Sequence, residues 1–593
     1  MNSIRDIIEH DLAIPDNEGP NKVMLLKEAV ARFVEPEMTI HAGITHGRPN
    51  AIMHEIARQF WGKDPRFFIS ALGFGYNWVI MVRGGLVKRV ASSFIGDPYP
   101  TPGPNPIFQK AYREKKVIFE NWSILSFTLR LMAAAMGLPY LPTRSIVGST
   151  MAEHNSENFT VVRDEASGQD IGLVKALVPD LGIIHGLAAD RCGNTILTPP
   201  LGDGVYGTMA AKRGTIVSVE KIVSTEFLRR HSHLVNLPGR FVSAVCEVPF
   251  GAHPSGISNH PDVPGVYGYA DDYDFVEELR ALCKDEKALD RWIEEWVLSV
   301  DHEGYLKKLG PQRMLFLKGK ADEDSWAAEL EPYLSEIENV KPPSQVELLV
   351  AAAGKKLADS VINHGYDTIL AGVGFSNLAA WLAAKSVKES GRHVDLMAEI
   401  GFYGYHPRPA DPFIFNYRNI STCAMLSDIH HIMGIFMSGA RGNCVGVIGA
   451  AQIDKHGNVN STMIPNKAFF VGSGGANDVA SAARETMVTM IQGKERMLEK
   501  VPYITSPGHH VKTLVTTLGI YEKLDDDDEF TLTAVIPDTD RPDVDSLVRR
   551  AKENCGWNLK AASEVAVIPP PALKELTILR LWDPKGQFLQ KLS

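Results

Sequence analysis

Apolar and polar positions alternate in blocks along this chain, and the blocks predict short strands separated by amphipathic helices. Near residue 40, the segment MTIHAGITHGRPNAIMHEIARQF indicates a buried strand, a glycine turn at Gly43 and a helix. Near residue 369, DTILAGVGFSNLAAWLAAKSV repeats this order with its turn at Gly372. Strands that alternate with helices pair in parallel, because each crossover helix returns the chain to the same edge. The pattern therefore predicts an α/β fold with mostly parallel sheets.

Two further blocks repeat in the same order, which predicts two homologous halves. LGIIHGLAADRCGN (181–194) is similar to VGVIGAAQIDKHGN (445–458), and each is an apolar strand followed by D-x-x-G-N. AAKRGTIVSVEKI (210–222) is similar to AARETMVTMIQGK (482–494). Asp and Asn side chains bond their own backbone in tight turns, so the D-x-x-G-N blocks are expected to close turns and not to perform chemistry.

An acidic stretch marks the predicted break between the halves. Residues 320–345, KADEDSWAAELEPYLSEIENVKPPSQ, end in a Pro-Pro pair. We predict a first domain over 1–320, a linker over 321–345 and a second domain over 346–593. Ligands of open α/β sheets collect outside the carboxyl ends of the strands, so we expect the active site between the two domains.

Composition narrows the class of protein. At 593 residues the chain is too long for one core, and 45% apolar with 22% charged residues is ordinary for a soluble protein. A formal charge of −10 argues against nucleic acid as a partner, and the lack of a long apolar run argues against a membrane span. Six scattered cysteines indicate reduced thiols and a cytoplasmic location. The His-His pairs lack metal-binding spacing, so no metal site is expected.

Residues 397–404, MAEIGFYG, place a carboxylate where a predicted strand ends among glycines. One interpretation is that Glu399 is a strand-end carboxylate that faces water. The other is that Gly401 and Gly404 leave space for a bulky thioester, and that Glu399 attacks its acyl group as a nucleophile. The residues alone give these two interpretations about equal weight.

A glycine-rich turn follows a strand in FFVGSGGANDVASAARE (469–485). Gly472, Gly474 and Gly475 expose backbone N–H groups at the start of a helix, which suits phosphate or a pantetheine chain. The spacing matches neither a Walker loop nor a full dinucleotide fingerprint. A purely structural turn is equally compatible with this stretch.

Several blocks together resemble a family I coenzyme A (CoA) transferase, most similar to the glutaconate CoA-transferase branch, with α and β subunits joined in one polypeptide. The β-like blocks are GAAQIDKHGNVNST (449–462), GSGGAND (472–478) and YITSPG (503–508). The α-like blocks are GGLVKRVASSFIG (84–96), FENWSILSFTLRLMAAAMGLPYLPTRS (119–145) and AAKRGTIVSVEKI. Glu399 falls where this family keeps its catalytic glutamate, in an E-x-G pattern.

The resemblance implies a ping-pong transfer of CoA between an acyl-CoA donor and a small carboxylic acid, through a γ-glutamyl-CoA thioester on Glu399. Each tetrahedral intermediate is an oxyanion, which glycine-rich turns can stabilise. The position of Gly372-Val373-Gly374 makes them candidate donors, and Gly401, Gly472, Gly474 and Gly475 are candidates for lining CoA. The acyl-CoA is a substrate, and no permanently bound cofactor is expected. A homodimer of such fused units is compatible with the resemblance.

Some relatives of this fold hydrolyse CoA esters or open β-oxo rings, and this gives an alternative. Glu120, in FENWS, is expected to match Glu399 topologically and is the rival acid/base. Its simpler interpretation is a carboxylate that caps the helix beginning near Trp122-Ser123. Arg48, Arg144 and Arg408 lie in predicted loops and are candidates to pair with a second carboxylate of the substrate.

Overall fold

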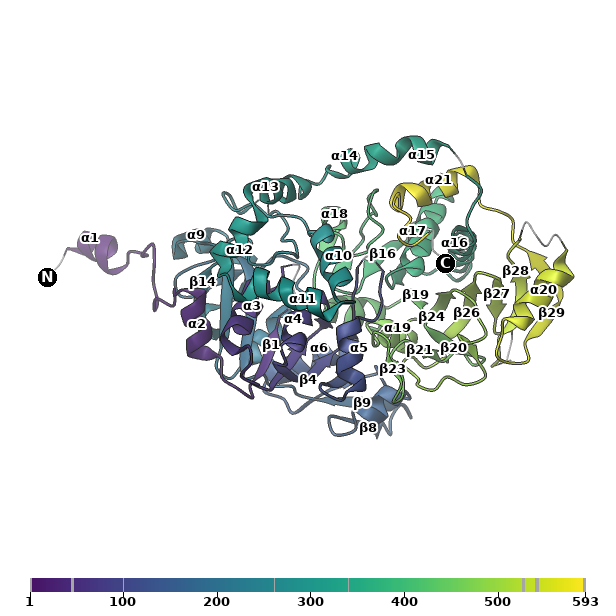
Figure 1. The fold of residues 1–593 in the computed structure, drawn as a ribbon, viewed down its shortest axis with the longest axis horizontal. Coiled ribbons are helices and arrows are strands. Elements are labelled where there is room, and N and C mark those ends of the chain that lie inside the picture. Colours follow the sequence, from purple (N-terminus) through teal and green to yellow (C-terminus); the bar gives the residue numbers. More distant parts are fainter. Residues whose placement is uncertain are drawn as a thin grey trace.

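The computed structural model describes residues 3–43, 47–99, 101–260, 262–339, 341–524, 528–538 and 543–589. Two α/β halves lie side by side, the first purple to blue and the second green to yellow (Figure 1). Each half is built on one large sheet with helices packed against it. Among the described residues, no helix combines the length and the apolar content that crossing a membrane requires.

The sheet of the first half is mainly parallel. Its strand order is β14-β12-β10-β1-β2-β4-β6, and every neighbouring pair in this order is parallel. The bounds are β14 Val242–Glu247, β12 Thr215–Ile222, β10 Leu181–Ala189, β1 Thr39–Ala42, β2 Phe67–Ala71, β4 Val87–Ser92 and β6 Ile118–Asn121.

The second sheet repeats five of these strands. Its order β26-β24-β19-β15-β16 corresponds to β14-β12-β10-β1-β2, again with parallel pairs throughout. The bounds are β26 Val511–Thr516, β24 Glu485–Met490, β19 Cys444–Gly449, β15 Thr368–Ala371 and β16 Asp395–Ala398. The predicted α/β class and the predicted internal repeat are both confirmed.

The repeated D-x-x-G-N blocks close tight turns, as expected. In the first half the Asn194 N–H donates to Asp190 Oδ1 at 2.9 Å, and in the second the Asn458 N–H donates to Asp454 Oδ1 at 3.0 Å. Each asparagine side chain then accepts a backbone N–H, from Gly239 and Gly508 respectively, at 2.9 Å. The two repeated blocks therefore have a structural role, and they form the same hydrogen bonds in both halves.

The chain that leads from the first half through the acidic stretch is largely helical. Helices α13 (Pro311–Lys320), α14 (Trp326–Leu330) and α15 (Leu334–Glu338) run across the top of the molecule from the first half toward the second (Figure 1). Helix α16 (Gln345–His364) then begins with a capping box at Ser344 and ends at Gly365, whose φ of 68° is left-handed. The domain bounds predicted from the sequence stay a prediction.

The halves meet where two helices begin. The first is α6 (Ile124–Ala135) and the second is α19 (Ala476–Ala482). The Ile124 N–H donates to the Gly474 carbonyl at 3.1 Å, and the Leu125 N–H donates to Asp478 Oδ2 at 3.1 Å. These contacts join backbone N–H groups at the start of α6 to the Gly474 carbonyl and to the Asp478 side chain, so they fix the glycine-rich turn of the second half against the first half.

Candidate functional site

A three-residue turn places Glu399 at the carboxyl end of strand β16. The turn leads into β17 (Phe402–Tyr403), which pairs antiparallel with β16 so that Ala398 faces Phe402. The Gly401 N–H donates to the Ala398 carbonyl at 3.1 Å, and Gly401 has a φ of 132°. A side chain at Gly401 would be strained in this conformation, so the glycine allows the turn that projects Glu399 from the sheet.

The space that Gly401 was expected to leave for a thioester is already filled. A Cβ at Gly401 would lie 2.3 Å from the Ser427 carbonyl oxygen and 2.9 Å from Pro200 Cβ. A Cβ at Gly404 would lie 2.9 Å from Ala424 Cβ. These two glycines therefore permit a tight turn and close packing behind Glu399.

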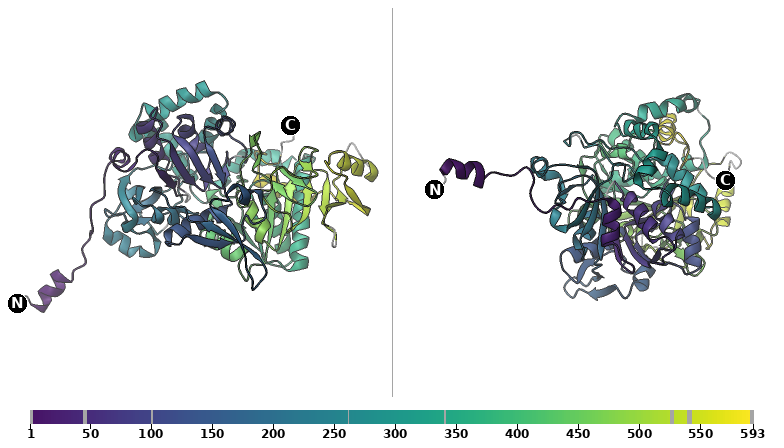
Figure 2. Two further views of the ribbon diagram at one scale, coloured as in Figure 1. Left: turned by 90° about the horizontal axis from the view of Figure 1, so that it is seen from below. Right: turned by 60° about the vertical axis from the view of Figure 1, so that its left-hand side comes forward.

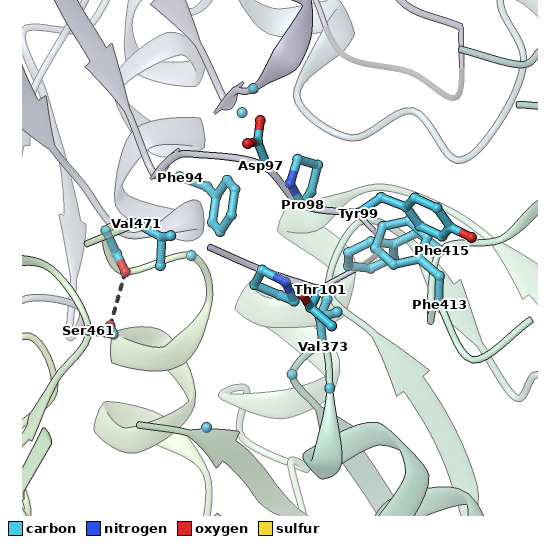
Figure 3. Close-up of a pocket in the computed structure, with 18 of the residues that line it drawn as sticks. Phe94, Asp97, Pro98, Tyr99, Thr101, Val373, Phe413, Phe415, Ser461 and Val471 are labelled. Atoms are coloured by element: carbon cyan, nitrogen blue, oxygen red, sulfur yellow. Dashed lines mark hydrogen bonds between the residues drawn. The ribbon is translucent and has the colours of Figure 1, made fainter. Parts of the chain in front are cut away.

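Glu399 lines a cavity of about 1170 Å³ between the two halves. Figure 3 shows Phe94, Pro98 and Tyr99 of the first half around the same space as Val373, Phe413 and Phe415 of the second. The Tyr99 ring lies edge-on to Phe413 with ring centroids 5.6 Å apart, and Phe413 lies edge-on to Phe415 at 5.5 Å. The cavity wall is thus largely apolar, and the Glu399 carboxylate forms part of this wall.

Gly475 is in contact with the Glu399 carboxylate. A Cβ at Gly475 would lie 2.1 Å from Glu399 Oε2, so only glycine lets the backbone come this close. Burial and the negative charge of Asp478 raise the pKa of Glu399 to about 8, against the opposing effect of a hydrogen bond from the Gly475 backbone. Burial and the nearby charge outweigh the one backbone donor, which favours the neutral form of Glu399 at neutral pH.

Asp478 supplies the nearby negative charge. It is fully buried on α19, and it accepts the Leu125 N–H of the first half. Burial raises the pKa of Asp478 to about 6, while hydrogen bonds from Ser123 and Ser145 oppose the shift. Asp478 is thus mostly ionised at pH 7. The residues around Asp478 in the sequence did not indicate that it lies near Glu399.

The three glycines of the turn before α19 all line the cavity, but they make different contacts. The Gly472 N–H donates to the Ser461 carbonyl at 3.2 Å, and the Gly474 N–H donates to the Ser93 carbonyl at 2.9 Å. A Cβ at Gly472 would lie 2.4 Å from Asn121 Nδ2. Gly472 and Gly474 therefore join the halves, whereas Gly475 contacts Glu399.

Gly372, Val373 and Gly374 also line the cavity, between β15 and α17 (Phe375–Glu389). The Gly372 N–H donates to the Val447 carbonyl at 2.9 Å, and the Gly374 N–H donates to Asn377 Oδ1 at 2.7 Å. Two of the N–H groups that were expected to face an oxyanion are thus engaged elsewhere. What this segment offers the cavity is the start of a 15-residue helix, which carries partial positive charge.

The expected topological match between Glu120 and Glu399 is wrong. Strand β2 is the counterpart of β16, so the residue that corresponds to Glu399 is Leu72, which lines the same cavity. Glu120 lies two strands away on β6, with its side chain hydrogen-bonded to Arg89, and it is not among the described residues that line the cavity. Helix α6 is capped by Ser123, whose hydroxyl accepts the Ser126 N–H at 3.2 Å, so Glu120 does not cap it either.

Arg48 is the candidate arginine that the structure brings to the cavity wall. Arg408 lies elsewhere, 3.4 Å from Asp324. Four further basic side chains line the cavity, and sequence reasoning missed them because they come from three segments far apart in the chain: Arg280, Lys284, Arg496 and Lys585.

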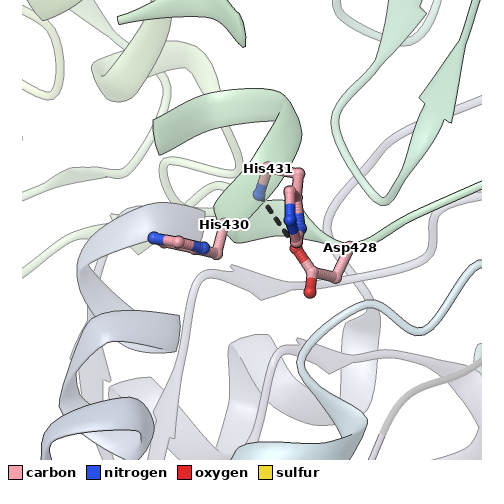
Figure 4. A group of neighbouring side chains, drawn as sticks. All are labelled: Asp428, His430 and His431. Atoms are coloured by element: carbon pink, nitrogen blue, oxygen red, sulfur yellow. Dashed lines mark hydrogen bonds and ion pairs between the residues drawn. The ribbon is translucent and has the colours of Figure 1, made fainter. Parts of the chain in front are cut away.

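A second polar cluster, Asp428, His430 and His431, lies on an edge where the halves touch (Figure 4). Their potential ligand atoms lie within 4.8 Å of one another, which could hold a metal ion. Both oxygens of the Asp428 carboxylate already accept hydrogen bonds: Oδ1 accepts the His431 N–H at 2.9 Å, and Oδ2 accepts the Tyr206 hydroxyl at 3.4 Å. These bonds give Asp428 a structural role at the junction of the halves.

Comparison with known proteins identifies relatives of both halves. The sequence profile of the coenzyme A transferase family matches residues 23–248 and 436–544. One subunit of the glutaconate CoA-transferase of Acidaminococcus fermentans is 30% identical over 318 residues, which is 50% of this chain and 95% of that polypeptide. One subunit of the 3-oxoadipate CoA-transferase of Pseudomonas knackmussii is 29% identical over 253 residues, 40% of this chain and 91% of that polypeptide.

Two other matches extend the picture. An uncharacterized protein of Archaeoglobus fulgidus is 30% identical over 303 residues, and the chain spans 64% of its length. The crystal structure of an acyl-CoA transferase from Escherichia coli O157:H7, in a thioester complex with CoA, covers 96% of this chain and 98% of its own, with a TM-score of 0.63 and 15% identity. At that identity the likeness shows the fold alone. The family profile and the matches to separate transferase subunits together show that the chain belongs to the coenzyme A transferase family, with the regions that resemble the two kinds of subunit joined in one polypeptide.

Proposed function

We propose that the protein transfers CoA from an acyl-CoA to a carboxylic acid, with Glu399 as the nucleophile. The observation that carries the proposal is the position of the Glu399 carboxylate, in the wall of the cavity between the halves and against the Gly475 backbone. An apolar wall excludes water from a reactive acyl intermediate, which favours transfer over hydrolysis.

The proposed reaction has four bond exchanges. The Glu399 carboxylate attacks the thioester carbonyl, the C–S bond breaks, and CoA thiolate leaves a mixed anhydride. The thiolate then attacks Glu399 Cδ, which releases the donor acid and leaves a γ-glutamyl-CoA thioester. The acceptor carboxylate attacks Cδ and expels CoA thiolate, and the thiolate attacks the acceptor acyl carbon, which frees Glu399. In this scheme the Gly475 N–H faces the carboxylate whose Cδ becomes tetrahedral, so it is the proposed oxyanion donor.

The basic side chains of the cavity suit the rest of the substrate, although Asp97, Asp271 and Glu277 also line it and Asp97 lies 3.5 Å from Arg280. The basic side chains Arg280, Lys284, Arg496 and Lys585 and the start of helix α17 are proposed to attract the phosphates of CoA. Relatives are named for glutaconate and 3-oxoadipate, both dicarboxylates. Arg48 is the proposed partner of a second carboxylate on the acid. With all six cysteines free, the cytoplasm stays the proposed compartment.

The rival function is hydrolysis with Glu120 as the base, since one subunit of a cholesterol ring-cleaving hydrolase of Mycobacterium tuberculosis is 30% identical over 253 residues. Glu120→Gln is expected to change CoA transfer less than about threefold, because Glu120 lies outside the cavity lining. It is expected to destabilise the fold by about 1–2 kcal/mol, because it weakens a partly buried pair with Arg89. The assay follows an acyl-CoA mixed with an unrelated acid by chromatography. Formation of the thioester between that acid and CoA supports transfer. Release of free CoA when no acceptor acid is present contradicts it, if this release is lost in the Glu120→Gln variant.

The raised pKa of Glu399 predicts the pH dependence of the first step. Only the carboxylate form attacks, so kcat/KM for the acyl-CoA is expected to rise about tenfold per pH unit and to level off near pH 8. Asp478→Asn removes the negative charge that raises this pKa, so the rising limb is expected to move to lower pH. The Glu120→Gln variant controls for a general effect of removing an acid and is expected to keep the wild-type limb. An Asp478→Asn limb that stays in place, or moves to higher pH, contradicts the role given to Asp478.

A further inference from the structure

The amide side chain of Asn121 lies where the two halves touch. Asn121 ends strand β6 of the first half and is 4% exposed. Seen from below, the blue part of the first half lies directly against the green part of the second half (Figure 2, left). Asn121 is not among the described residues that line the cavity, and the proposed reaction does not use it. It is nevertheless a buried polar group, whose N–H and oxygen atoms need hydrogen-bond partners.

The hydrogen bonds of this amide are divided between the halves. In the first half, Asn121 Nδ2 donates to the Ser93 carbonyl at 3.0 Å and to the Ser92 carbonyl at 3.4 Å. In the second half, the Ser473 N–H and the Thr462 hydroxyl donate to Asn121 Oδ1, at 3.1 Å and 3.2 Å. Since carbonyls only accept and a backbone N–H only donates, the amide fits between these groups in a single orientation.

The bond from Ser473 belongs to a series made by consecutive N–H groups of the glycine-rich turn. The Ser473 N–H donates to the amide, and the Gly474 N–H donates to the Ser93 carbonyl at 2.9 Å. The next N–H, that of Gly475, donates to the Glu399 carboxylate. The first half therefore holds the two residues that come directly before the proposed oxyanion donor.

Gly472 allows the amide to come this close to the turn. Its φ is 97°, which favours glycine, and a Cβ there would lie 2.4 Å from Asn121 Nδ2 and 2.7 Å from the Ser93 carbonyl oxygen. A side chain at Gly472 would thus push the amide away from the turn. The contact with Asn121 gives this glycine a structural reason that is separate from binding CoA.

We propose that Asn121 is a positioning residue for CoA transfer: it fixes the turn of the second half so that the Gly475 N–H points at Glu399. The inference rests on the proposed function, in which Glu399 is the nucleophile and the Gly475 N–H is the oxyanion donor. Such a donor is effective only when it is held in place before the charge develops, and a displacement of about 1 Å can slow a reaction about 100-fold. Neither half alone then holds a complete site.

Asn121→Ala removes the bonds of the amide to both halves. The kcat of CoA transfer is expected to fall by about 10-fold to 100-fold, and KM for the acyl-CoA by less than about threefold either way, because the residues that line the cavity are unchanged. The rising limb of kcat/KM is expected to move to higher pH, because the Gly475 hydrogen bond that lowers the pKa of Glu399 is weakened. A loss of folded protein would lower the rate equally along this limb and would not move it.

Asn194→Ala is the matched control. Its side chain also joins separate parts of the backbone, since it donates to Asp190 Oδ2 and accepts the Gly239 N–H, each at 2.9 Å. Asn194 is not among the described residues that line the cavity, so this variant is expected to lose stability and to keep the wild-type kcat and pH limb. Thr462→Val is a milder second variant that removes one bond to Asn121 and keeps the shape of the side chain. It is expected to change kcat and the limb in the same directions as Asn121→Ala, by smaller amounts.

Thermal unfolding followed by circular dichroism first establishes which variants are folded, and Glu399→Gln is assayed beside them. The inference is overturned if Asn121→Ala, or Thr462→Val where Asn121→Ala does not fold, keeps the wild-type kcat or loses kcat without moving the limb. When Glu399→Gln is inactive in the same assay, that failure concerns Asn121 alone. Turnover by Glu399→Gln would instead overturn the proposed function, and the role of Asn121 with it.

Discussion

Glu399→Ala is expected to abolish CoA transfer, lowering kcat by about 10⁴-fold or more, because it removes the atom that bonds to the acyl group and later to CoA. Loss of the nucleophile prevents both half-reactions, so exchange between an acyl-CoA and its own acid must stop as well. Acyl-CoA binding is expected to persist, since the apolar wall and the basic side chains of the cavity are unchanged.

Two controls separate this effect from misfolding. Glu399→Gln keeps the size of the side chain and removes the nucleophile, so it is expected to be as inactive as Glu399→Ala. Both variants are expected to unfold at or above the wild-type temperature. The pKa of Glu399 is higher in the folded protein than the value of 4.5 expected in the unfolded chain, so its ionisation destabilises the fold above pH 4.5. Turnover above a tenth of wild type in either variant removes Glu399 from the mechanism.

Gly475→Ala is expected to lower kcat by about 100-fold, since its Cβ would lie 2.1 Å from Glu399 Oε2. The methyl group must push the carboxylate aside, which breaks the contact with the Gly475 backbone and misplaces the attacking oxygen. The effect should fall mainly on kcat, because the new methyl group is directed at Glu399 and not at the walls that bind CoA.

Gly449→Ala is the matched control for crowding of the cavity. Gly449 also lines the cavity, but a Cβ there would meet its nearest atom, Ser376 Oγ, at 3.9 Å, which is an ordinary contact. This variant is expected to stay within about threefold of wild type. Equal losses of activity in Gly475→Ala and Gly449→Ala would mean that the cavity tolerates no added volume. The contact of Gly475 with Glu399 would then not explain the loss.

Hydrophobic periodicity and turn signals were enough to predict the α/β class and the internal repeat. The strand-turn-helix blocks at Thr39–Ala42 and Thr368–Ala371 occupy equivalent places in two sheets with the same five-strand order. The duplicated D-x-x-G-N blocks form the same hydrogen bonds in both halves. These features are local in sequence, so alternation and turn chemistry reveal them.

Features that depend on the meeting of distant segments were missed. The match of Glu120 to Glu399 failed because strands β4 and β6 extend the first sheet beyond β2, and block order alone does not reveal strand order. The N–H groups of Gly372 and Gly374 are engaged by Val447 and Asn377, which no glycine count can show. The contact of Gly475 with Glu399 and the nearby charge of Asp478 arise only when β16 and α19 are brought together.

The most direct measurement of the role of Glu399 is the mass of the intact protein after incubation with an acyl-CoA and no acceptor acid. The proposed mechanism predicts a covalent adduct equal to CoA less one water, mapped by peptide fragmentation to Glu399 and absent from Glu399→Gln. An unmodified protein that has turned the acyl-CoA over, or an adduct on any other residue, would contradict it.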